Sequence, residues 1–239
     1  MKPFESTLIQ KAAADCGYER TPELADSALV LRSVSFPESV RVSVIENSQF
    51  ELRSDWLLRD EASGFYEGRA KAKGLEGLYA ALQRFAVLAR TRPERLVDAF
   101  AEATASMPRT TEAQRLVVER VGQSLFRTAL LDYWGRRCCV SGLDVPELLR
   151  ASHIKPWSMC ASDKERLSVN NGLLLAPHFD ALFDGGWMTV DDDGSVRLSK
   201  RLSEDAQARL GLSRELEVCG LTIAHRAFLA FHRSMVFRV

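Results

Sequence analysis

All four histidines of this 239-residue chain lie after residue 150, and the first two stand in short segments rich in residues suited to catalysis. One segment is Ala-Ser-His-Ile-Lys-Pro-Trp at 151–157, and the other is Pro-His-Phe-Asp-Ala-Leu-Phe-Asp at 177–184. A neutral imidazole accepts protons near neutral pH, and carboxylates are the ligands that hard divalent cations prefer. These two segments are therefore the candidates for a catalytic site.

The second segment contains two aspartates at helical spacing. A proline opens it and a glycine follows it, which predicts a helix over 177–184. On this helix Asp180 and Asp184 share a face, whereas His178 points about 200° away from Asp180. Beside a histidine on a neighbouring strand, the carboxylate pair would suit Mg²⁺ and leave the imidazole free to act as a base. Two surface aspartates on a capped helix, with a hydrogen-bonded histidine, explain the same spacing.

Two strands and a long helix are expected to position these side chains. The strands are predicted at 138–141 and 148–154, so that the order along the chain is strand, strand, loop, helix. Ahead of them, a helix should begin near the threonines 110 and 111 and end at Gly135. Its apolar stripe recurs every four residues, at Val117, Val121, Leu125 and Ala129.

Residues 1–107 are expected to form a small α+β domain of their own. Alternating apolar and polar residues predict strands, and apolar residues at helical spacing followed by a proline predict two helices. The strands are 29–31, 40–44 and 50–52, the first helix contains Leu78 to Ala89, and the second begins at Pro93. The proline at 108 marks the boundary with a second domain over 108–239. The first domain contains no histidine and no glycine-rich phosphate loop, so its sequence does not indicate a chemistry.

The composition is that of a globular protein, with 46% apolar residues and 32 basic against 32 acidic side chains. No apolar run reaches the roughly 18 residues of a membrane helix, and the start lacks the apolar stretch of a signal peptide. We therefore expect a cytoplasmic protein without a membrane partner. The five cysteines are odd in number and contain no Cys-x-x-Cys pair, which argues against a disulfide framework and a four-thiolate zinc site.

Charge is distributed unevenly along the second half of the chain. Residues 109–137 contain six arginines and three acidic residues, 195–239 contain eight basic and four acidic residues, and 180–193 is acidic. This order is typical of a metal-dependent enzyme that acts on a polyphosphate, although solvated helix faces explain it equally well. The histidines at 225 and 232 are expected in the core. Phosphate contacts are expected from Arg115, Arg120, Arg127, Lys155, Arg226 and Arg233.

Four short motifs in a fixed order resemble the HNH endonuclease family. They are Cys-Cys-Val-Ser-Gly (138–142), Ala-Ser-His-Ile-Lys-Pro-Trp (151–157), Asn-Gly-Leu-Leu-Leu (171–175) and Asp-Ala-Leu-Phe-Asp (180–184). The resemblance covers about a fifth of the chain closely. It implies an α+β fold in which a ββα-metal finger, a two-stranded hairpin packed on one helix around a divalent cation, lies C-terminally among flanking helices.

The resemblance also implies a role for each motif residue. His153 resembles the general base that takes a proton from the water attacking phosphorus, and Asn171 resembles the asparagine that orients this imidazole through its loop. Asp180 stands where the third motif residue binds the metal, and Asp184 completes the same helical face. Ser152 stands where an acidic metal ligand is common, and its neutral hydroxyl is a poor ligand for Mg²⁺.

The activity that the resemblance implies is metal-dependent hydrolysis of phosphodiester bonds in DNA, in the context of restriction or phage defence. The cofactor would be Mg²⁺ or another divalent cation such as Mn²⁺, and a homodimer is one possible assembly. No structural zinc is expected, because only Cys138 remains of the paired cysteines that hold zinc in many members of the family.

Two other functions stay open. Ser152 favours a catalytically inactive HNH scaffold that only binds DNA, whereas a histidine-metal hydrolase of small phosphoesters would need a closed pocket. Because a lone finger contacts mainly the nucleic-acid backbone, residues 1–107 are expected to be a targeting or sensing module.

Overall fold

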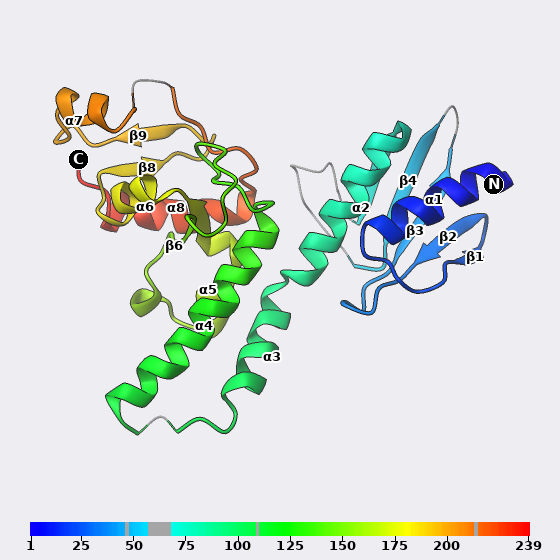
Figure 1. Ribbon diagram of the computed structural model, residues 1–239, viewed down its shortest axis with the longest axis horizontal. Helices are drawn as coiled ribbons and strands as arrows, with labels where there is room; N and C mark the ends of the chain where they lie inside the picture. Colours follow the sequence, from blue (N-terminus) through cyan, green and yellow to red (C-terminus); the bar gives the residue numbers. More distant parts are fainter. Residues whose placement is uncertain (46–47, 57–67, 109, 213–214) are drawn as a thin grey trace. The chain divides into compact units, whose positions relative to one another are not determined.

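The computed structural model describes residues 1–45, 48–56, 68–108, 110–212 and 215–239 (Figure 1). The chain divides into two compact units, Met1–Arg90 and Thr91–Val239. Both units combine helices with antiparallel strands, so the α+β class predicted from the sequence is confirmed. Across the described ranges, no helix is both long and apolar enough to cross a membrane.

The first unit contains a five-stranded antiparallel sheet whose strands follow chain order. They are β1 (Glu23–Ala25), β2 (Ala28–Leu31), β3 (Val40–Val44), β4 (Gln49–Ser54) and β5 (Arg69–Lys73). The three predicted strands correspond to β2, β3 and β4, and this prediction is confirmed. The other two were missed because β1 has only three residues and β5 alternates charged residues with alanine rather than with large apolar residues.

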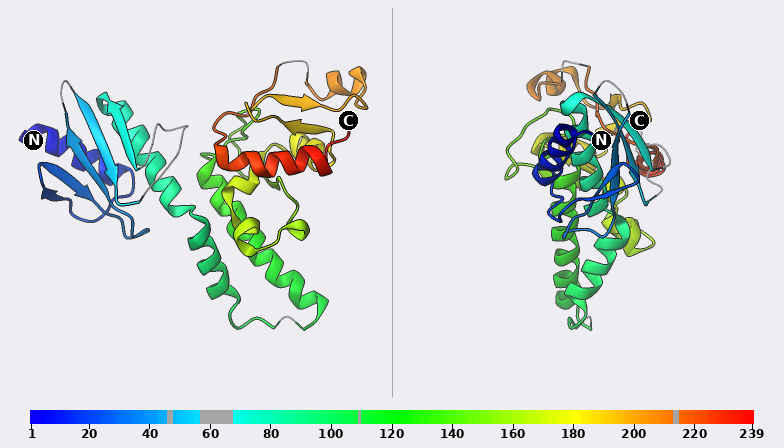
Figure 2. Two further views of the ribbon diagram at one scale, coloured as in Figure 1. Left: turned by 180° about the vertical axis from the view of Figure 1, so that it is seen from behind. Right: turned by 90° about the vertical axis from the view of Figure 1, so that its right-hand side faces the viewer.

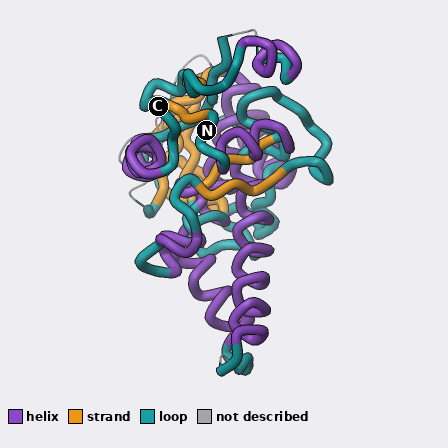
Figure 3. The backbone as a smooth tube through the Cα atoms, turned by 90° about the vertical axis from the view of Figure 1, so that its left-hand side faces the viewer, coloured by secondary structure: helices purple, strands orange, loops and turns teal. Residues whose placement is uncertain are grey.

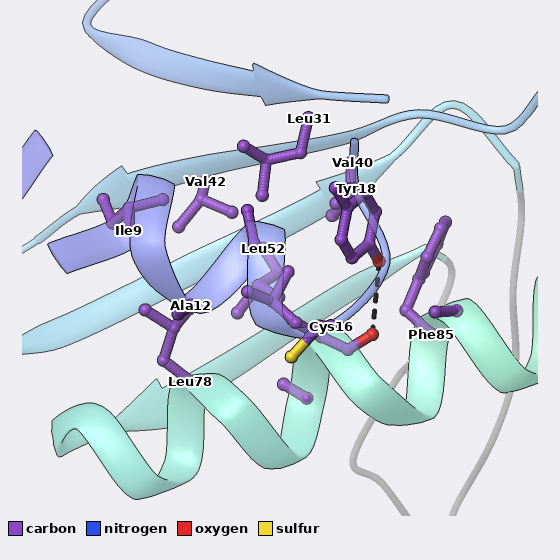
Figure 4. Close-up of a cluster of buried hydrophobic side chains, with 14 of the residues drawn as sticks. Ile9, Ala12, Cys16, Tyr18, Leu31, Val40, Val42, Leu52, Leu78 and Phe85 are labelled. Atoms are coloured by element: carbon purple, nitrogen blue, oxygen red, sulfur yellow. Dashed lines mark hydrogen bonds between the residues drawn. The ribbon is translucent and has the colours of Figure 1, made fainter. Parts of the chain in front are cut away.

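Helices α1 (Pro3–Asp15) and α2 (Gly74–Arg90) pack on each other and on one face of this sheet (Figure 1). Helix α2 contains the predicted helix from Leu78 to Ala89, so this prediction is confirmed, whereas α1 was not predicted. Figure 4 shows the core between the helices and the strands, with Ile9, Val42 and Leu78 facing one another. The buried Tyr18 hydroxyl donates to the carbonyl oxygen of Leu82 at 3.2 Å. The first unit therefore has a hydrophobic core of its own.

The second unit begins with α3 (Pro93–Thr104) and α4 (Glu112–Tyr133), which lie side by side (Figure 3). Helix α3 also contacts α5 (Asp163–Leu167), and Lys164 Nζ lies 2.7 Å from Glu94 Oε1. The predicted domain boundary lay near residue 107, whereas the structure divides after residue 90. The difference arises because α3 packs on helices of the second unit.

Helix α4 begins where the sequence predicts, because the Thr111 hydroxyl accepts a hydrogen bond from the Gln114 amide at 3.3 Å. The predicted apolar stripe is confirmed at Ala129, whereas Val121 and Leu125 are half-buried and Val117 is 51% exposed. The buried residues are Val118, Gly122, Phe126, Ala129, Leu130 and Tyr133. This face is buried because it packs against β6 and β7, and Val117 lies one position outside it.

Strand β6 (Arg150–His153) pairs antiparallel with β7 (Gly172–Leu175). The predicted strand at 138–141 is wrong, because these residues form a turn in which the Cys139 amide donates to the carbonyl oxygen of Leu174 at 2.9 Å. The apolar residues at 138–141 favour a strand locally. Strand β6 pairs instead with β7, which follows β6 by about twenty residues in the chain. The order is therefore strand, loop with α5, strand, helix.

Helix α6 (Pro177–Asp184) follows β7 and has the bounds that the sequence predicts. The remaining elements are β8 (Met188–Val190), β9 (Val196–Leu198), α7 (Glu204–Arg209) and α8 (Ile223–Met235), with 3₁₀ turns at Trp157–Met159 and Val169–Asn171. Helix α8 packs along β8 (Figure 2). The acidic residues 191–193 form the turn between β8 and β9, as predicted.

Candidate active site

Strands β6 and β7 present their two faces to different helices. His153 pairs with Gly172, and both face α4, because a Cβ atom at Gly172 would lie 2.5 Å from the Phe126 ring. The hydroxyl of Ser152 instead donates to Asp184 Oδ1 of α6 at 3.1 Å. Successive residues of a strand point to opposite faces. Ser152 and His153 therefore belong to two separate clusters of side chains.

The carboxylate cluster consists of Ser152, Asp180 and Asp184. Ser152 is only 2% exposed, and its hydroxyl interacts with both carboxylates. Helix α6 thus brings both aspartates to the same neighbour, as their four-residue spacing predicts. The structure brings together the three residues that the sequence analysis assigned to the metal.

Burial governs the electrostatics of this cluster. It raises the pKa of Asp180 above its ordinary value, against weaker lowering by the Ser152 hydroxyl and the charge of Arg150. Burial also raises the pKa of Asp184, and the negative charge of Asp180 raises it further. Both shifts have the same direction, although Asp180 is half-buried and Asp184 is exposed at the end of α6. The cluster therefore favours a bound proton or cation.

The imidazole cluster surrounds His153 with Phe126, Trp157 and Arg166. The imidazole stacks on the Phe126 ring at a centroid distance of 3.8 Å, and the Trp157 ring meets it edge-on at 5.7 Å. Atom Nε2 of His153 lies 2.8 Å from the carbonyl oxygen of Arg166. A carbonyl can only accept, so Nε2 is the protonated nitrogen and Nδ1 has the free lone pair of the neutral ring.

The neutral form of His153 is also favoured electrostatically. Burial lowers its pKa below the ordinary value, and the hydrogen bond to the Arg166 carbonyl opposes this shift more weakly. At neutral pH the ring is therefore uncharged and its Nδ1 is able to accept a proton.

Asn171 is fully buried and joins two parts of the loop between β6 and β7. Its Oδ1 accepts from the Lys155 amide at 2.8 Å, and its Nδ2 donates to the carbonyl oxygens of Lys155 and Glu165 at 3.2 and 3.1 Å. These bonds fix the residues that follow His153 against the segment that contains Arg166. The carbonyl that orients the imidazole is therefore held in place through Asn171.

An open cavity of about 380 Å³ adjoins the imidazole cluster. Trp157 and Arg166 belong to both, and Arg166 Nη1 lies 2.8 Å from Asp163 Oδ1. The cavity is not the closed pocket that a hydrolase of small phosphoesters would need. Its lining residues are Phe100, Arg115, Val118, Glu119, Trp157, Asp163 and Arg166.

Among the six basic residues expected to contact phosphates, Arg127, Lys155 and Arg233 have well-defined partners within the protein. Arg127 donates to two backbone carbonyl oxygens of the 146–149 turn at 2.6 and 2.7 Å. Lys155 Nζ lies 2.8 Å from Glu165. Arg233 does not point outward as expected, because the acidic turn lies beside α8 and Asp192 pairs with its guanidinium at 2.7 Å. These residues have structural partners that a phosphate would have to displace.

The other three basic residues, Arg115, Arg120 and Arg226, are exposed. Arg115 also lines the open cavity next to the imidazole cluster. Their long, charged side chains are accessible to an anion from solvent. Their exposure is compatible with the phosphate contacts expected from the sequence.

The other histidines lie outside both clusters. His178 is exposed on α6, whereas His225 and His232 are buried, at 0% and 1% exposure, as predicted. His232 Nδ1 lies 2.9 Å from the Thr189 hydroxyl, and its Nε2 donates to the carbonyl oxygen of Phe183 at 3.1 Å. The ring of His232 also stacks on that of Phe183. His232 therefore holds the end of α6 that contains the carboxylate cluster.

The carboxylate cluster fits a hard divalent cation. Mg²⁺ usually binds one or two carboxylates and completes its octahedral shell with water and substrate phosphate oxygens. Asp180 and Asp184 supply this number, and the upward shifts of their pKa values indicate negative charge that the surroundings do not neutralise. In the part of the chain that the structure describes, no group of three His, Cys, Asp or Glu side chains is placed to hold a metal ion. A cation would therefore have few protein ligands here.

Phe126 and Arg166, which define the surroundings of His153, were not predicted from the sequence. Phe126 could have been placed beside His153 only if the buried face of α4 had been predicted correctly. The bond to the Arg166 carbonyl joins residues 13 positions apart through the backbone of a loop. No side-chain pattern indicates such a contact in advance.

Residues 138–191 match the family model of the HNH endonucleases. This segment contains β6, β7 and α6, and with them the carboxylate cluster and His153. A comparison with curated proteins found no match to the chain. The family match indicates a nuclease that acts on nucleic acid. Residues 138–191 therefore form a domain of the HNH endonuclease family.

Proposed function

We propose that this chain is a metal-dependent endonuclease that hydrolyses phosphodiester bonds in DNA. The observation that supports this most directly is the carboxylate cluster, which begins at Ser152, the residue next to a neutral, oriented His153. Binding of a cation and acceptance of a proton are the two tasks that such a hydrolysis needs.

His153 is the proposed general base. Its Nδ1 would accept a proton from the water that attacks phosphorus. The bond from Nε2 to the Arg166 carbonyl fixes the tautomer and favours the protonated ring once the proton has moved. Asn171 acts as a positioning residue, because it holds the loop that supplies this carbonyl.

Asp180 and Asp184 are the proposed ligands of Mg²⁺ or Mn²⁺, with Ser152 as a weak neighbour. When bound, the cation would neutralise charge that develops on the phosphate and on the leaving oxygen. The two clusters lie on opposite faces of β6. Adjacent Cα atoms are only about 3.8 Å apart, however, so a phosphate at the end of the strand would be near both.

The second candidate is a DNA-binding protein that keeps the HNH scaffold without cleaving. Two observations favour it. Ser152 adds no charge to the cluster, and Phe126 and Trp157 both pack against the ring of His153. Such a protein would bind DNA equally well with and without a divalent cation and leave the DNA intact.

Nicking of supercoiled plasmid in Mg²⁺, in Mn²⁺ and in EDTA distinguishes the two candidates. For the nuclease, we expect cleavage in either cation and none in EDTA. His153→Ala should slow cleavage by about 100-fold or more, because a general base acts in the chemical step. Its affinity for DNA should stay within about twofold, because phosphate contacts supply the affinity.

The matched control is His178→Ala, which removes an exposed imidazole from the same domain. It should cleave at the rate of the unmodified chain. Equal rates for His153→Ala and the unmodified chain would remove His153 from the proposed role. Absence of cleavage by the unmodified chain in both cations, with DNA binding intact, would favour the inactive scaffold.

We also propose that the first unit directs the nuclease to its target, in restriction or phage defence. The independent core of this unit supports a separate role. A single HNH finger contacts mainly backbone, so a choice among sites would have to come from elsewhere in the chain.

A further inference from the structure

Among the described residues of the first unit, no helix packs on the second face of the sheet. Helices α1 and α2 and the hydrophobic core cover the other face. On the second face, strands β3, β4 and β5 present basic side chains that alternate with buried apolar residues. We call this the basic sheet face, and it consists of Arg41, Arg53, Arg69, Lys71 and Lys73.

The three arginines of this face lie in one row across β3, β4 and β5. The register pairs Arg41 with Arg53 and Arg53 with Arg69, so like charges lie in a row across three strands. Neighbouring strands are about 4.8 Å apart, and like charges in directly opposed positions destabilise a sheet. Two carboxylates relieve the row in part, because Glu51 lies 2.8 Å from Arg53 and Asp26 lies 3.8 Å from Arg41.

The row remains accessible despite these two partners. The side chains of Arg41 and Arg53 are 56% and 54% exposed, and Arg69 is exposed as well. On the edge strand β5, Lys71 and Lys73 continue the positive charge at intervals of about 7 Å. The basic sheet face therefore offers several cations to one extended anion.

Protection of the sheet edge explains only part of this pattern. Lysines on an edge strand discourage pairing with another chain, which accounts for Lys71 and Lys73 on β5. Arg41 and Arg53 lie on β3 and β4, which both have neighbours on each side. The interior arginines therefore need another explanation, such as an anionic partner.

We propose that the basic sheet face binds the phosphate backbone of DNA without regard to sequence. This proposal rests on the proposed nuclease function, and it names the partner of the first unit. Guanidinium groups suit phosphate because they donate two parallel hydrogen bonds. The described neighbours of these residues on the face include the polar Ser43 and Gln49, so the surface has little to insert into a membrane.

The test compares two triple variants of the full chain. Arg69→Gln/Lys71→Gln/Lys73→Gln removes three charges from the basic sheet face. Lys2→Gln/Lys11→Gln/Arg20→Gln removes three exposed charges, from the residue before α1, from α1 itself and from the segment that follows it. Both variants have the same net charge. Affinity for a short duplex of mixed sequence is measured by fluorescence anisotropy in EDTA, over a range of salt concentrations.

We expect the sheet variant to bind about tenfold more weakly than the control variant at low salt. The dependence of log affinity on log salt should become shallower by up to about 2.7, at about 0.9 per phosphate contact. Equal affinities for the two variants would overturn the proposal. Binding to phosphatidylserine vesicles that the sheet variant loses, without a change in DNA binding, would assign the face to a membrane instead.

The outcomes are separable from those of the nuclease test. A chain that never nicks plasmid but loses DNA affinity in the sheet variant would overturn the nuclease and support the basic sheet face. A chain that nicks plasmid in Mg²⁺ while both variants bind DNA equally would support the nuclease and overturn the DNA-binding role of the basic sheet face. Circular dichroism on both variants should match the unmodified chain, because all six side chains are exposed.

Discussion

At the scale of single residues, Asp184 stands where its charge is unfavourable in the absence of a cation. Burial and the charge of Asp180 both raise its pKa. Asp184→Asn should therefore stabilise the metal-free protein slightly, by well under about 1 kcal/mol, because Asp184 is exposed and solvent screens its charge. The increase in Tm that Mg²⁺ causes in the unmodified chain should be lost. Thermal unfolding with and without Mg²⁺ measures both effects.

Asp193→Asn is the control for this prediction. Asp193 lies in the exposed turn after β8, where hydrogen bonds from Ser195 lower the pKa of its carboxyl. Its replacement should leave the response to Mg²⁺ unchanged. An Asp184→Asn protein with a lower Tm and a normal response to Mg²⁺ would contradict the assignment of the carboxylate cluster.

His232 should make the stability of the second unit depend on pH. Burial lowers its pKa to about 4, whereas the unfolded chain has the ordinary value of 6.5. Between these values the unfolded state binds a proton that the folded state does not, so stability is complete above pH 6.5 and falls as pH drops toward 4. The loss from this group between pH 7.5 and 5 should be about 2 kcal/mol.

Urea unfolding of the unmodified chain and of His232→Gln at pH 7.5 and 5 isolates this contribution from that of other titrating groups. The variant should lose less stability on acidification. The same loss in both proteins would show that His232 is protonated in the fold and that the stacking on Phe183 does not exclude water.

At the scale of elements, local patterns predicted those pieces whose ends are defined by their own residues. Helix α6 lies between a proline and a glycine, α4 begins at a threonine cap, and β3 alternates apolar and polar residues. The partner of β6 could not be predicted in this way. The segment at 138–141 is as suitable for a strand as residues 172–175, and the choice depends on packing between distant segments.

The same distinction holds for the candidate site. The shared face of Asp180 and Asp184 follows from helix geometry, and alternation on β6 places Ser152 and His153 on opposite faces. Which helix covers each face depends on tertiary packing. The aromatic ring beneath His153 was therefore outside the reach of the sequence analysis.

Gly122 of α4 lies directly against the Trp157 ring of the imidazole cluster. A Cβ atom there would overlap the Trp157 ring and lie 3.2 Å from Phe100. Gly122→Ala should destabilise the protein by about 1–3 kcal/mol, because an added methyl group would force Trp157 away from His153. Denaturant unfolding measures the loss, and plasmid nicking should slow in the same variant.

A second helical glycine supplies the control. At Gly77 in α2, the nearest atom to an added Cβ would be 3.6 Å away, which is an ordinary contact. Gly77→Ala should therefore be neutral or stabilising by up to about 1 kcal/mol, since alanine favours helix. If Gly122→Ala behaved like Gly77→Ala, the packing of Trp157 on α4 would be incorrect.

At the scale of the whole molecule, the division after residue 90 predicts which fragment folds. A fragment of residues 91–239 keeps α3, with its contacts to α4 and α5 and the pair between Glu94 and Lys164. A fragment of residues 108–239 loses them and exposes the face of α4 that α3 covers. We expect the longer fragment to unfold cooperatively and at a higher Tm, measured by circular dichroism.

The longer fragment also tests the targeting role of the first unit. It should nick DNA in Mg²⁺ with weaker or altered choice of sites. A fragment that unfolds cooperatively and cuts the same sites at the same rate as the full chain would assign the first unit to another task. Equal Tm values for the two fragments would favour a domain boundary near residue 107.

The burial of Asn171 has a consequence for the ageing of the protein. Asn171 precedes Gly172, and in flexible chains such a pair loses ammonia when the glycine nitrogen attacks the side-chain amide. In the fold, Gly172 is extended, with φ −151° and ψ 147°, and both polar atoms of Asn171 are bound. An aspartate at this position could not donate to the carbonyls of Lys155 and Glu165, so each episode of unfolding risks permanent loss of the loop that orients His153. The working lifetime of the nuclease should therefore follow its unfolding rate. Mass spectrometry of stored protein should find deamidation at Asn171 that increases with storage time, and increases faster under conditions that speed unfolding.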